Sequence, residues 1–156
     1  MPEPKYSMTS RTGSDNQRYG SKGERLVAGV VPLAPDKSKV MLIQSSSRKG
    51  WVLPKGGWEK DEKTAAAAAA REAWEEAGII VRVEKDLGTI LDNRPTQNSA
   101  PKACYQFFEA TVTEARAEWP EKAKRERRWF SYTDATAQLA QRPELTEALR
   151  RSGIRR

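Results

Sequence analysis

Short runs of apolar and β-branched residues recur along most of this chain, and one longer stretch follows a helical period instead. The short runs predict strands at residues 26–32, 39–45, 51–53, 79–87, 88–92, 104–113 and 127–132. Residues 64–77 are predicted to form a helix, because six consecutive alanines favour helix, Thr64 or Asp61 can cap its start and Gly78 suits its end. Two further helices are predicted near residues 134–141 and 144–151, separated by Pro143. Strands around one central helix, followed by C-terminal helices, predict an α/β fold with a mixed sheet packed between helices.

The pattern is that of a single domain, since 156 residues can bury one sizeable core. Residues 1–23 are polar and predicted to be flexible, the domain is expected at residues 24–152, and residues 153–156 are expected to be a short basic tail. We find no apolar run of membrane-spanning length and no apolar segment typical of a secretory signal. Cys104 is the single cysteine, so we expect a reducing compartment, cytoplasmic or nuclear.

The predicted helix at residues 64–77 carries three glutamates on one face. A step of about 100° per residue places Glu72, Glu75 and Glu76 within an arc of roughly 100°. Carboxylates this close repel one another, so stability alone does not explain them, whereas Mg²⁺ prefers such oxygen ligands and also binds substrate phosphates. The alternative is an ordinary amphipathic helix with a solvated acidic face. The opposite face, predicted to pack on the sheet, consists of Ala66, Ala70, Ala73, Trp74 and Ala77.

The chain contains no histidine. Its absence excludes a Ser-His-Asp triad, a Cys-His pair, histidine-ligated zinc and a histidine general base. Neither a P-loop pattern nor a dinucleotide-binding glycine fingerprint occurs. Carboxylate and metal chemistry therefore remains, in agreement with the glutamate helix.

Basic residues outnumber acidic ones, 28 against 21, for a net charge of +7. The acidic residues concentrate around the glutamate helix, so the basic excess lies elsewhere and favours a substrate with many phosphates. The loop at residues 93–102 is expected to border that substrate. Arg127, just before the apolar pair Trp129-Phe130, is either substrate-facing or structural. The remaining basic candidates are Lys22, Arg25, Arg48, Lys49, Lys55, Arg94, Lys102 and the run at residues 122–128.

The glutamate helix and the loop before it resemble the Nudix box, a signature of hydrolases of nucleoside diphosphates linked to another moiety. The pattern here is Gly56-x5-Glu62-x8-Arg71-Glu72-Ala73-x-Glu75-Glu76-x-Gly78-Ile79. The usual spacing from the first glutamate to the arginine is one residue shorter, which we interpret as an insertion that leaves Glu62 in its role. The resemblance implies an α/β/α sandwich with Mg²⁺, or Mn²⁺, as cofactor.

The roles implied by the box fall on particular residues of this chain. Glu72 and Glu76 would be the main metal ligands, with help from Glu75 and the backbone of Gly56. Glu76 or Glu75 would accept the proton of the attacking water. The structural residues of the motif would be Glu62, Arg71 and Gly78, and Arg71 is predicted to tie the loop to the helix by ion pairing.

Within the Nudix group, residues 25–132 resemble the diphosphoinositol polyphosphate phosphohydrolases, particularly short fungal ones. The resemblance rests on Ser45-Ser46-Ser47-Arg48, on Trp51-Val52-Leu53-Pro54-Lys55-Gly56-Gly57, on the box and on Arg127-Arg128-Trp129-Phe130. It implies removal of the β-phosphate from inositol pyrophosphates, a phosphate-signalling activity, and cleavage of diadenosine penta- and hexaphosphates. Human-like members have three glycines where this chain has Lys55-Gly56-Gly57, and a histidine that Lys102 could replace. The predicted substrate contacts are Lys22, Arg25, Ser46, Ser47, Arg48, Lys55, Gly56, Gly57, Lys102 and Arg127.

Three alternatives remain open. A hydrolase of diadenosine polyphosphates or capped RNA would use the same chemistry, and Pro95, 17 positions after Gly78, stands roughly where ADP-ribose hydrolases of this group carry a proline. A catalytically silent polyanion- or RNA-binding module is less favoured, because it has no need of three clustered glutamates and few aromatic residues accompany the basic run. We expect a small polyphosphorylated substrate, no membrane or nucleic-acid partner and a monomer. Some relatives in plant-pathogenic fungi act inside host cells, so secretion as an effector also stays open.

Overall fold

The computed structural model describes residues 6–46, 49–95 and 101–156. Two predicted substrate contacts, Ser47 and Arg48, lie outside the described residues, and so does the centre of the predicted substrate loop at residues 96–100.

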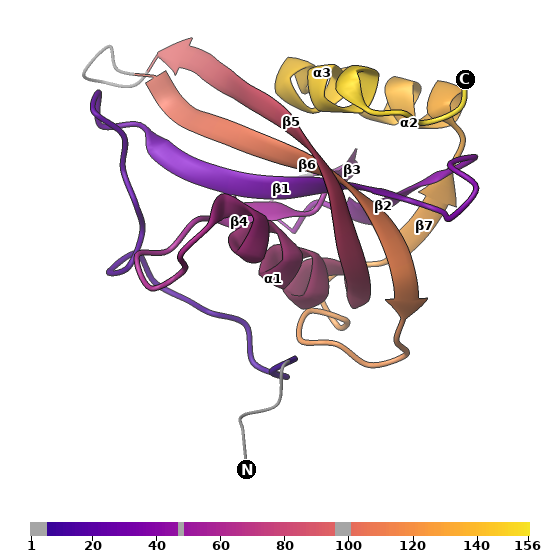
Figure 1. The fold of residues 1–156 in the computed structure, drawn as a ribbon, viewed down its shortest axis with the longest axis horizontal. Coiled ribbons are helices and arrows are strands. Elements are labelled where there is room, and N and C mark those ends of the chain that lie inside the picture. The colour runs from indigo at the N-terminus through magenta and orange to yellow at the C-terminus, as the bar shows by residue number, and fades with distance from the viewer. Residues whose placement is uncertain (1–5, 47–48, 96–100) are drawn as a thin grey trace.

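The strands of the described residues form one mixed sheet (Figure 1). Strand β1 pairs in parallel with β6, and all the other strand pairs are antiparallel. Two short strands leave the main path, since β4 (Lys55–Gly57) pairs with β1 and β7 (Arg127–Phe130) pairs with β2. The main path runs in the order β3 (Trp51–Val52), β2 (Val40–Gln44), β1 (Arg25–Leu33), β6 (Pro101–Ala115) and β5 (Ile79–Pro95).

Helices cover both faces of this sheet (Figure 1). Helix α1 (Ala65–Ala77) lies on one face, against β1, β4 and β5. Helices α2 (Tyr132–Gln138) and α3 (Pro143–Arg151) lie on the other, α3 against β5. The predicted α/β/α sandwich with a mixed sheet is confirmed. Its core is closed by fully buried side chains from both layers, among them Leu33, Leu42, Ile43, Phe107, Leu145 and Leu149.

Helix α1 begins and ends where the sequence predicts. The Thr64 hydroxyl accepts a hydrogen bond from the Ala67 N–H at 3.1 Å, and Gly78 ends the helix at a φ of 67°, which glycine adopts at little cost. The buried face is broader than predicted. Ala73 is fully buried against the sheet, whereas Ala70 and Trp74 face the N-terminal segment.

The predicted strands differ from the observed ones in three respects: two are merged, two are longer and one was missed. The expected strands at residues 79–87 and 88–92 are one strand, β5, because Gly88 takes a φ of 85° at an irregularity in the register with β6 instead of ending the strand. Strands β5 and β6 extend to Pro95 and Pro101, so the predicted loop at 93–102 is shorter than expected. The sequence reasoning missed β4, whose two glycines lack the apolar pattern of a strand.

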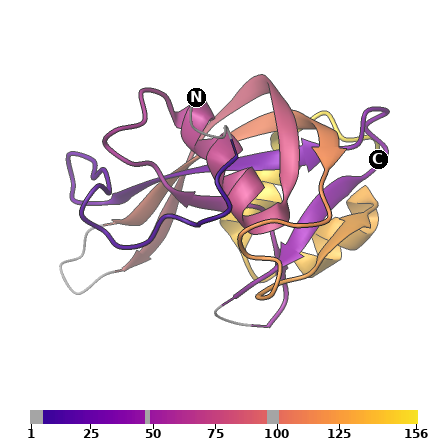
Figure 2. The same ribbon diagram turned by 90° about the horizontal axis from the view of Figure 1, so that it is seen from below.

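The N-terminal residues run along α1 and the loop before it (Figure 2). Gln17 forms a β-bridge with Glu59, and Tyr19 forms one with Arg25. The predicted flexibility of residues 1–23 stays a prediction, but residues 6–23 are in contact with the domain. At the other end Ile154 is buried, within the expected tail. Among the helices of the described residues, none is long and apolar enough to cross a membrane.

Candidate active site

Two of the three glutamates of α1, Glu72 and Glu76, lie beside β4. The Glu72 carboxylate packs so closely on Gly56 that a Cβ at that position would come within 2.2 Å of the Glu72 Cδ. Only glycine leaves this space, which explains its presence in a strand. The backbone N–H of Lys55 donates a hydrogen bond of 3.0 Å to Glu76 Oε1. Two of the three carboxylates, those of Glu72 and Glu76, therefore contact strand β4.

Arg71 connects the loop before α1, the helix and β4. Its Nε and Nη2 both donate to the Glu62 carboxylate at 2.8 Å. Nη2 also donates to the Gly57 carbonyl at 2.9 Å, and Nη1 donates to Glu72 Oε1 at 2.9 Å. The extra residue between Glu62 and Arg71 is thus accommodated in the loop without separating the pair. A planar guanidinium suits this arrangement, because it can bind one carboxylate with two parallel hydrogen bonds.

The carboxylates of this face are not fully neutralised by their neighbours. Burial and the charge of Glu76 raise the pKa of Glu72 to about 8. Burial also raises the pKa of Glu76 to about 7, against the lowering effects of Arg125 and Lys55. Burial raises the pKa of Glu75 too, and Arg71 partly offsets it. Side chains in this state favour either protons or an additional cation.

The donor atoms of this face fit a hard divalent cation. Glu72 and Glu76 lie one helical turn apart, and the carbonyl of Gly56 belongs to the adjacent strand. Glu75 is held elsewhere, because its Oε1 accepts the Arg11 N–H at 3.3 Å and its Oε2 lies 3.2 Å from Arg71 Nη1. Consistent with this, no three acidic, histidine or cysteine side chains in the described ranges converge as a ready metal site.

Arg125 places a buried positive charge at the edge of the site. Its Nη2 lies 3.7 Å from Glu76 Oε2 and 2.7 Å from Glu121 Oε1, and its side chain is only 8% exposed. The same Nη2 donates to Ser46 Oγ at 3.4 Å. Arg125 therefore brings Ser46, a predicted substrate contact, to the glutamate face. Sequence reasoning placed Arg125 in a basic run without singling it out, since nothing local shows that this arginine turns inward.

Lys55 extends the positive charge across the sheet. Gly29 leaves the room for it, since a Cβ on Gly29 would lie 2.8 Å from the Lys55 Cβ and 2.6 Å from Phe107 Cε1. Burial lowers the pKa of the Lys55 ammonium against the raising effect of Glu76, and Arg142 and Arg125 lower it further. The Lys55 ammonium therefore interacts electrostatically with both Glu76 and Arg142.

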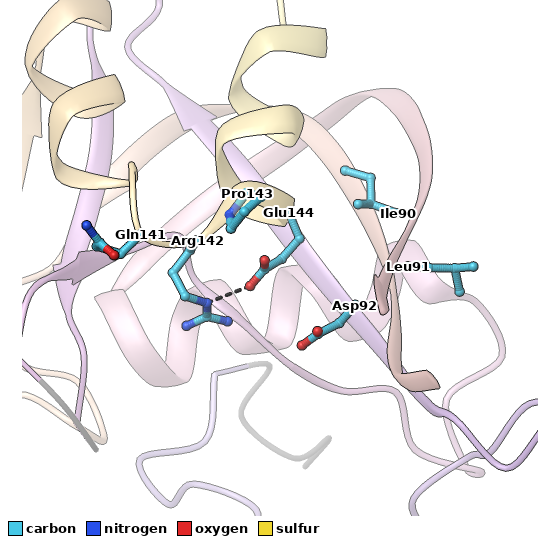
Figure 3. Close-up of a pocket in the computed structure, with 7 residues that line it drawn as sticks. All are labelled: Ile90, Leu91, Asp92, Gln141, Arg142, Pro143 and Glu144. Atoms are coloured by element: carbon cyan, nitrogen blue, oxygen red, sulfur yellow. Dashed lines mark hydrogen bonds and ion pairs between the residues drawn. The ribbon is translucent and has the colours of Figure 1, made fainter. Parts of the chain in front are cut away.

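Arg142 lines a pocket of about 530 Å³ between β5 and the start of α3 (Figure 3). Its guanidinium bonds Glu144 and reaches the Tyr105 hydroxyl at 3.5 Å. The pocket is also lined by the apolar side chain of Ile90 and by the buried carboxylate of Asp92, whereas the Leu91 side chain points away from it (Figure 3). Arg142 was missed by the sequence reasoning, because a single arginine before a proline carries no signal beyond a helix start.

Two other predicted substrate contacts, Arg127 and Arg25, bind other parts of the chain instead of facing the glutamates. Arg127 donates to the Ala77 and Gly78 carbonyls at 2.9 and 3.2 Å and stacks 4.2 Å from the Trp119 ring, so its guanidinium serves the end of α1. Arg25 is in register with Ala103 at the start of β1 and β6 and donates to Gln17 Oε1 at 3.3 Å.

The remaining predicted substrate contacts are two lysines and Gly57. Lys22 and Lys102 are exposed. A Cβ at Gly57 would come within 2.0 Å of Gln17 Oε1, so this glycine makes room for the N-terminal segment. Gly56, Lys55 and Ser46 are thus grouped around the glutamates, whereas Lys22, Arg25 and Lys102 lie toward the far end of β1 or in exposed positions.

Comparison with known proteins agrees with this geometry. A family model described as the NUDIX domain matches residues 23–151. Nudix hydrolase 21, chloroplastic, from Arabidopsis thaliana is 37% identical over 153 residues, which cover 94% of this chain and 75% of that protein. A NUDIX hydrolase from Nitrosomonas europaea shares the fold with a TM-score of 0.69 and 18% identity, over 82% of this chain and 87% of that one. An Ap4A hydrolase of C. elegans, solved as a binary complex, shares it with a TM-score of 0.63 and 24% identity, over 81% and 93%.

Proposed function

Because this chain belongs to the NUDIX family of hydrolases, we propose that it cleaves the diphosphate of inositol pyrophosphates and releases the β-phosphate, with Mg²⁺ as cofactor. Mn²⁺ is the second metal that the same oxygen ligands would accept. The family assignment gives the reaction class, and the proposal names the substrate. Support for it comes from the charges around the glutamate face.

The observation that carries the proposal is the row of cations beside Glu76. The Arg125 guanidinium lies 3.7 Å from its carboxylate. Burial lowers the pKa of the Lys55 ammonium and the charge of Glu76 opposes this, so the two charges interact. Buried or half-buried cations next to a metal-binding face favour a substrate that presents several phosphates, not one diphosphate alone. Arg142 also acts electrostatically on Lys55 and adds a further positive charge to this region.

In the proposed mechanism the residues of the site hold the cation, position one another, accept a proton or bind phosphate. The carboxylates of Glu72 and Glu76 and the Gly56 carbonyl hold the cation, and Arg71 keeps Glu72 in place through its 2.9 Å bond. Bound Mg²⁺ supplies Lewis acidity, which makes a water molecule more acidic and offsets the charge of the leaving phosphate. Glu76 would also accept the proton of the attacking water. Lys55 and Arg125 bind the phosphates that are not cleaved.

A second candidate has an observation of its own. The pocket of about 530 Å³ lined by Arg142 has an apolar side chain, Ile90, and two buried carboxylates, Asp92 and Glu144 (Figure 3). Apolar walls with a few acceptors suit a nucleobase, whose amino groups donate hydrogen bonds, better than another phosphate. This pocket favours a diadenosine polyphosphate such as Ap5A or Ap6A. ADP-ribose, a smaller substrate that also carries a nucleobase, would suit it for the same reason.

The test is a comparison of kcat/KM with Mg²⁺ for diphosphoinositol pentakisphosphate, diadenosine hexaphosphate and ADP-ribose. We expect the inositol pyrophosphate to be preferred, and Lys55→Gly to reduce that preference by about tenfold, as expected for one charge-assisted contact. Lys39→Gly, at an exposed lysine of a turn, is the matched control and should change nothing. A preference for the dinucleotide that survives Lys55→Gly would reject the proposal in favour of the second candidate.

Glu76→Gln tests the chemistry separately from the substrate. It keeps the side-chain size and the acceptor for the Lys55 N–H but removes the charge. We expect loss of turnover of every substrate, with an unchanged circular dichroism spectrum. Near-normal turnover would show that the proton acceptor is elsewhere, and binding of polyanions without turnover in the unaltered protein would favour the silent module.

We also propose a cytoplasmic or nuclear location. The relative from Arabidopsis thaliana that is described as chloroplastic leaves an organelle as the alternative. A fluorescent fusion of the full-length protein expressed in its own cells would distinguish these compartments.

A further inference from the structure

Residues 6–11 cross the outer side of α1, and we name them the strap (Figure 2). The Tyr6 ring packs on Trp74 with ring centroids 5.4 Å apart, and Trp74 Nε1 donates to the Ser7 carbonyl at 2.7 Å. Further along, Ser10 Oγ donates to Glu121 Oε2 at 2.9 Å. The strap is thus attached to α1 and to the segment after β6.

The end of the strap reaches the acidic residues of the site. The Arg11 guanidinium lies 2.7 Å from Glu59 Oε1 and 2.8 Å from Asp61 Oδ1, in the loop before α1. The backbone N–H of Arg11 donates to Glu75 Oε1 at 3.3 Å, while Arg71 holds Glu75 Oε2. Each Glu75 oxygen already accepts a hydrogen bond and 4% of the residue is exposed, so a cation would compete with the strap for Glu75 Oε1.

We propose that the strap is an autoinhibitory latch on divalent metal binding. In its closed position it withholds Glu75 and places the Arg11 charge on the acidic loop, so a metal ion must displace it to gain the third carboxylate. Arg11 is a positioning residue, because it acts through Glu75 and the loop and not on the substrate. The inference rests on the proposed function only in requiring that the glutamate face binds a divalent cation.

The strap is held weakly enough to be displaced. Arg11 and Asp61 are 39% and 56% exposed at their side chains, and exposed ion pairs contribute little and are screened by salt. Beside these contacts, a pocket of about 590 Å³ lies between part of the strap and α1. It is lined on one side by Tyr6, Thr9 and Arg11 and on the other by Ala67, Ala70 and Trp74. Such loose packing favours a segment that can lift without disturbing the core.

The experiment is a calorimetric titration of the full-length protein with Mn²⁺ in the absence of substrate. Arg11→Gln should lower the Mn²⁺ dissociation constant by roughly three- to tenfold, the range expected from losing a competing closed state held by exposed ion pairs. Ser10→Ala loosens the strap without changing any charge and should shift the constant in the same direction. Arg11→Lys keeps the charge but not the fork of donors, so it should restore part of the wild-type affinity.

A matched control separates the latch from a general charge effect. Arg82→Gln removes one exposed, ion-paired arginine on β5 and changes the net charge equally. It should leave Mn²⁺ affinity unchanged. Unaltered or weaker Mn²⁺ binding in Arg11→Gln, or an equal gain in Arg82→Gln, would overturn the proposal.

Kinetics provide a second readout that a purely structural role would not give. For the strap variants we expect a lower half-saturating Mg²⁺ concentration with an unchanged kcat at saturating Mg²⁺. An unchanged half-saturating Mg²⁺ concentration would overturn the latch. If no tested substrate is hydrolysed, the proposed function fails, but the Mn²⁺ titration still decides whether the latch exists.

Discussion

Glu72→Gln should stabilise the metal-free protein at alkaline pH. The change keeps the side-chain size and an oxygen for the Arg71 Nη1–H, but it removes one of three neighbouring charges on α1. Burial and then the charge of Glu76 raise the pKa of Glu72 from 4.5 to about 8. A carboxyl with a raised pKa is penalised only when ionised. The penalty is therefore absent below the unfolded value of 4.5, grows as the pH rises and is complete above about 8.

The size of the gain follows from that difference. At 1.36 kcal/mol per unit, the interval from 4.5 to about 8 corresponds to an upper limit of about 5 kcal/mol. Part of this repulsion is shared with Glu76, and relaxation of the surroundings reduces it, so we expect about 2 kcal/mol at about pH 9. For a chain of this length that is an increase in Tm of about 4–8 °C.

The assay is thermal unfolding followed by circular dichroism in a chelating buffer at about pH 4 and about pH 9. The gain should appear only at the higher pH. Glu84→Gln is the control, because the pKa of Glu84 is shifted in the opposite direction to that of Glu72. Hydrogen bonds from Arg82 and Thr111 lower the pKa of Glu84. Its carboxylate contributes stability above the unfolded value that is lost as pH falls, so Glu84→Gln should give no gain at about pH 9.

Added Mg²⁺ should make the wild-type protein more stable than the Glu72→Gln variant, the reverse of the order expected without metal. A ligand that binds only the folded state stabilises it by mass action, and Glu72→Gln removes one of the proposed ligands. The wild-type Tm should therefore rise with Mg²⁺ while that of the variant changes little. A variant that is no more stable than the wild type at about pH 9 without metal would refute the claim that this face is held under electrostatic repulsion.

Three further substitutions test individual contacts. Gly56→Ala would place a Cβ 2.2 Å from the Glu72 Cδ and displace that carboxylate, so Mg²⁺-dependent turnover should fall by at least about 100-fold while circular dichroism reports an intact fold. Gly78→Ala combines a φ of 67° with a Cβ 2.5 Å from the Trp119 ring and should destabilise by about 2–4 kcal/mol, measured by urea unfolding. Arg127→Gln removes the guanidinium bonded to the last carbonyls of α1, so it should lower Tm by several degrees and leave KM unchanged, whereas a raised KM at unchanged Tm would return Arg127 to the substrate contacts.

Much of the fold could be predicted because its signals are local. The helix Ala65–Ala77 follows from alanine propensity, the Thr64 cap and the left-handed Gly78. Its three glutamates follow from the helical period, and the box pattern led to the family that the comparisons then showed. Where a glycine could either break a strand or form a bulge, as at Gly88, the sequence alone did not decide, because the ladder with β6 determines which occurs.

The sequence by itself determined the family and the groups available at the candidate site: a helix with three carboxylates, a glycine pair to approach them and an excess of positive charge. Only the tertiary structure decided which charges face the site. Arg125 turns inward to Glu76, Arg127 turns to the end of α1, and Arg11, distant in sequence, lies beside Glu75. The physical reason is that spacing along a helix fixes neighbours within a few residues, whereas the partner of a long, flexible arginine depends on which buried carboxylate or carbonyl the folded chain brings within its reach.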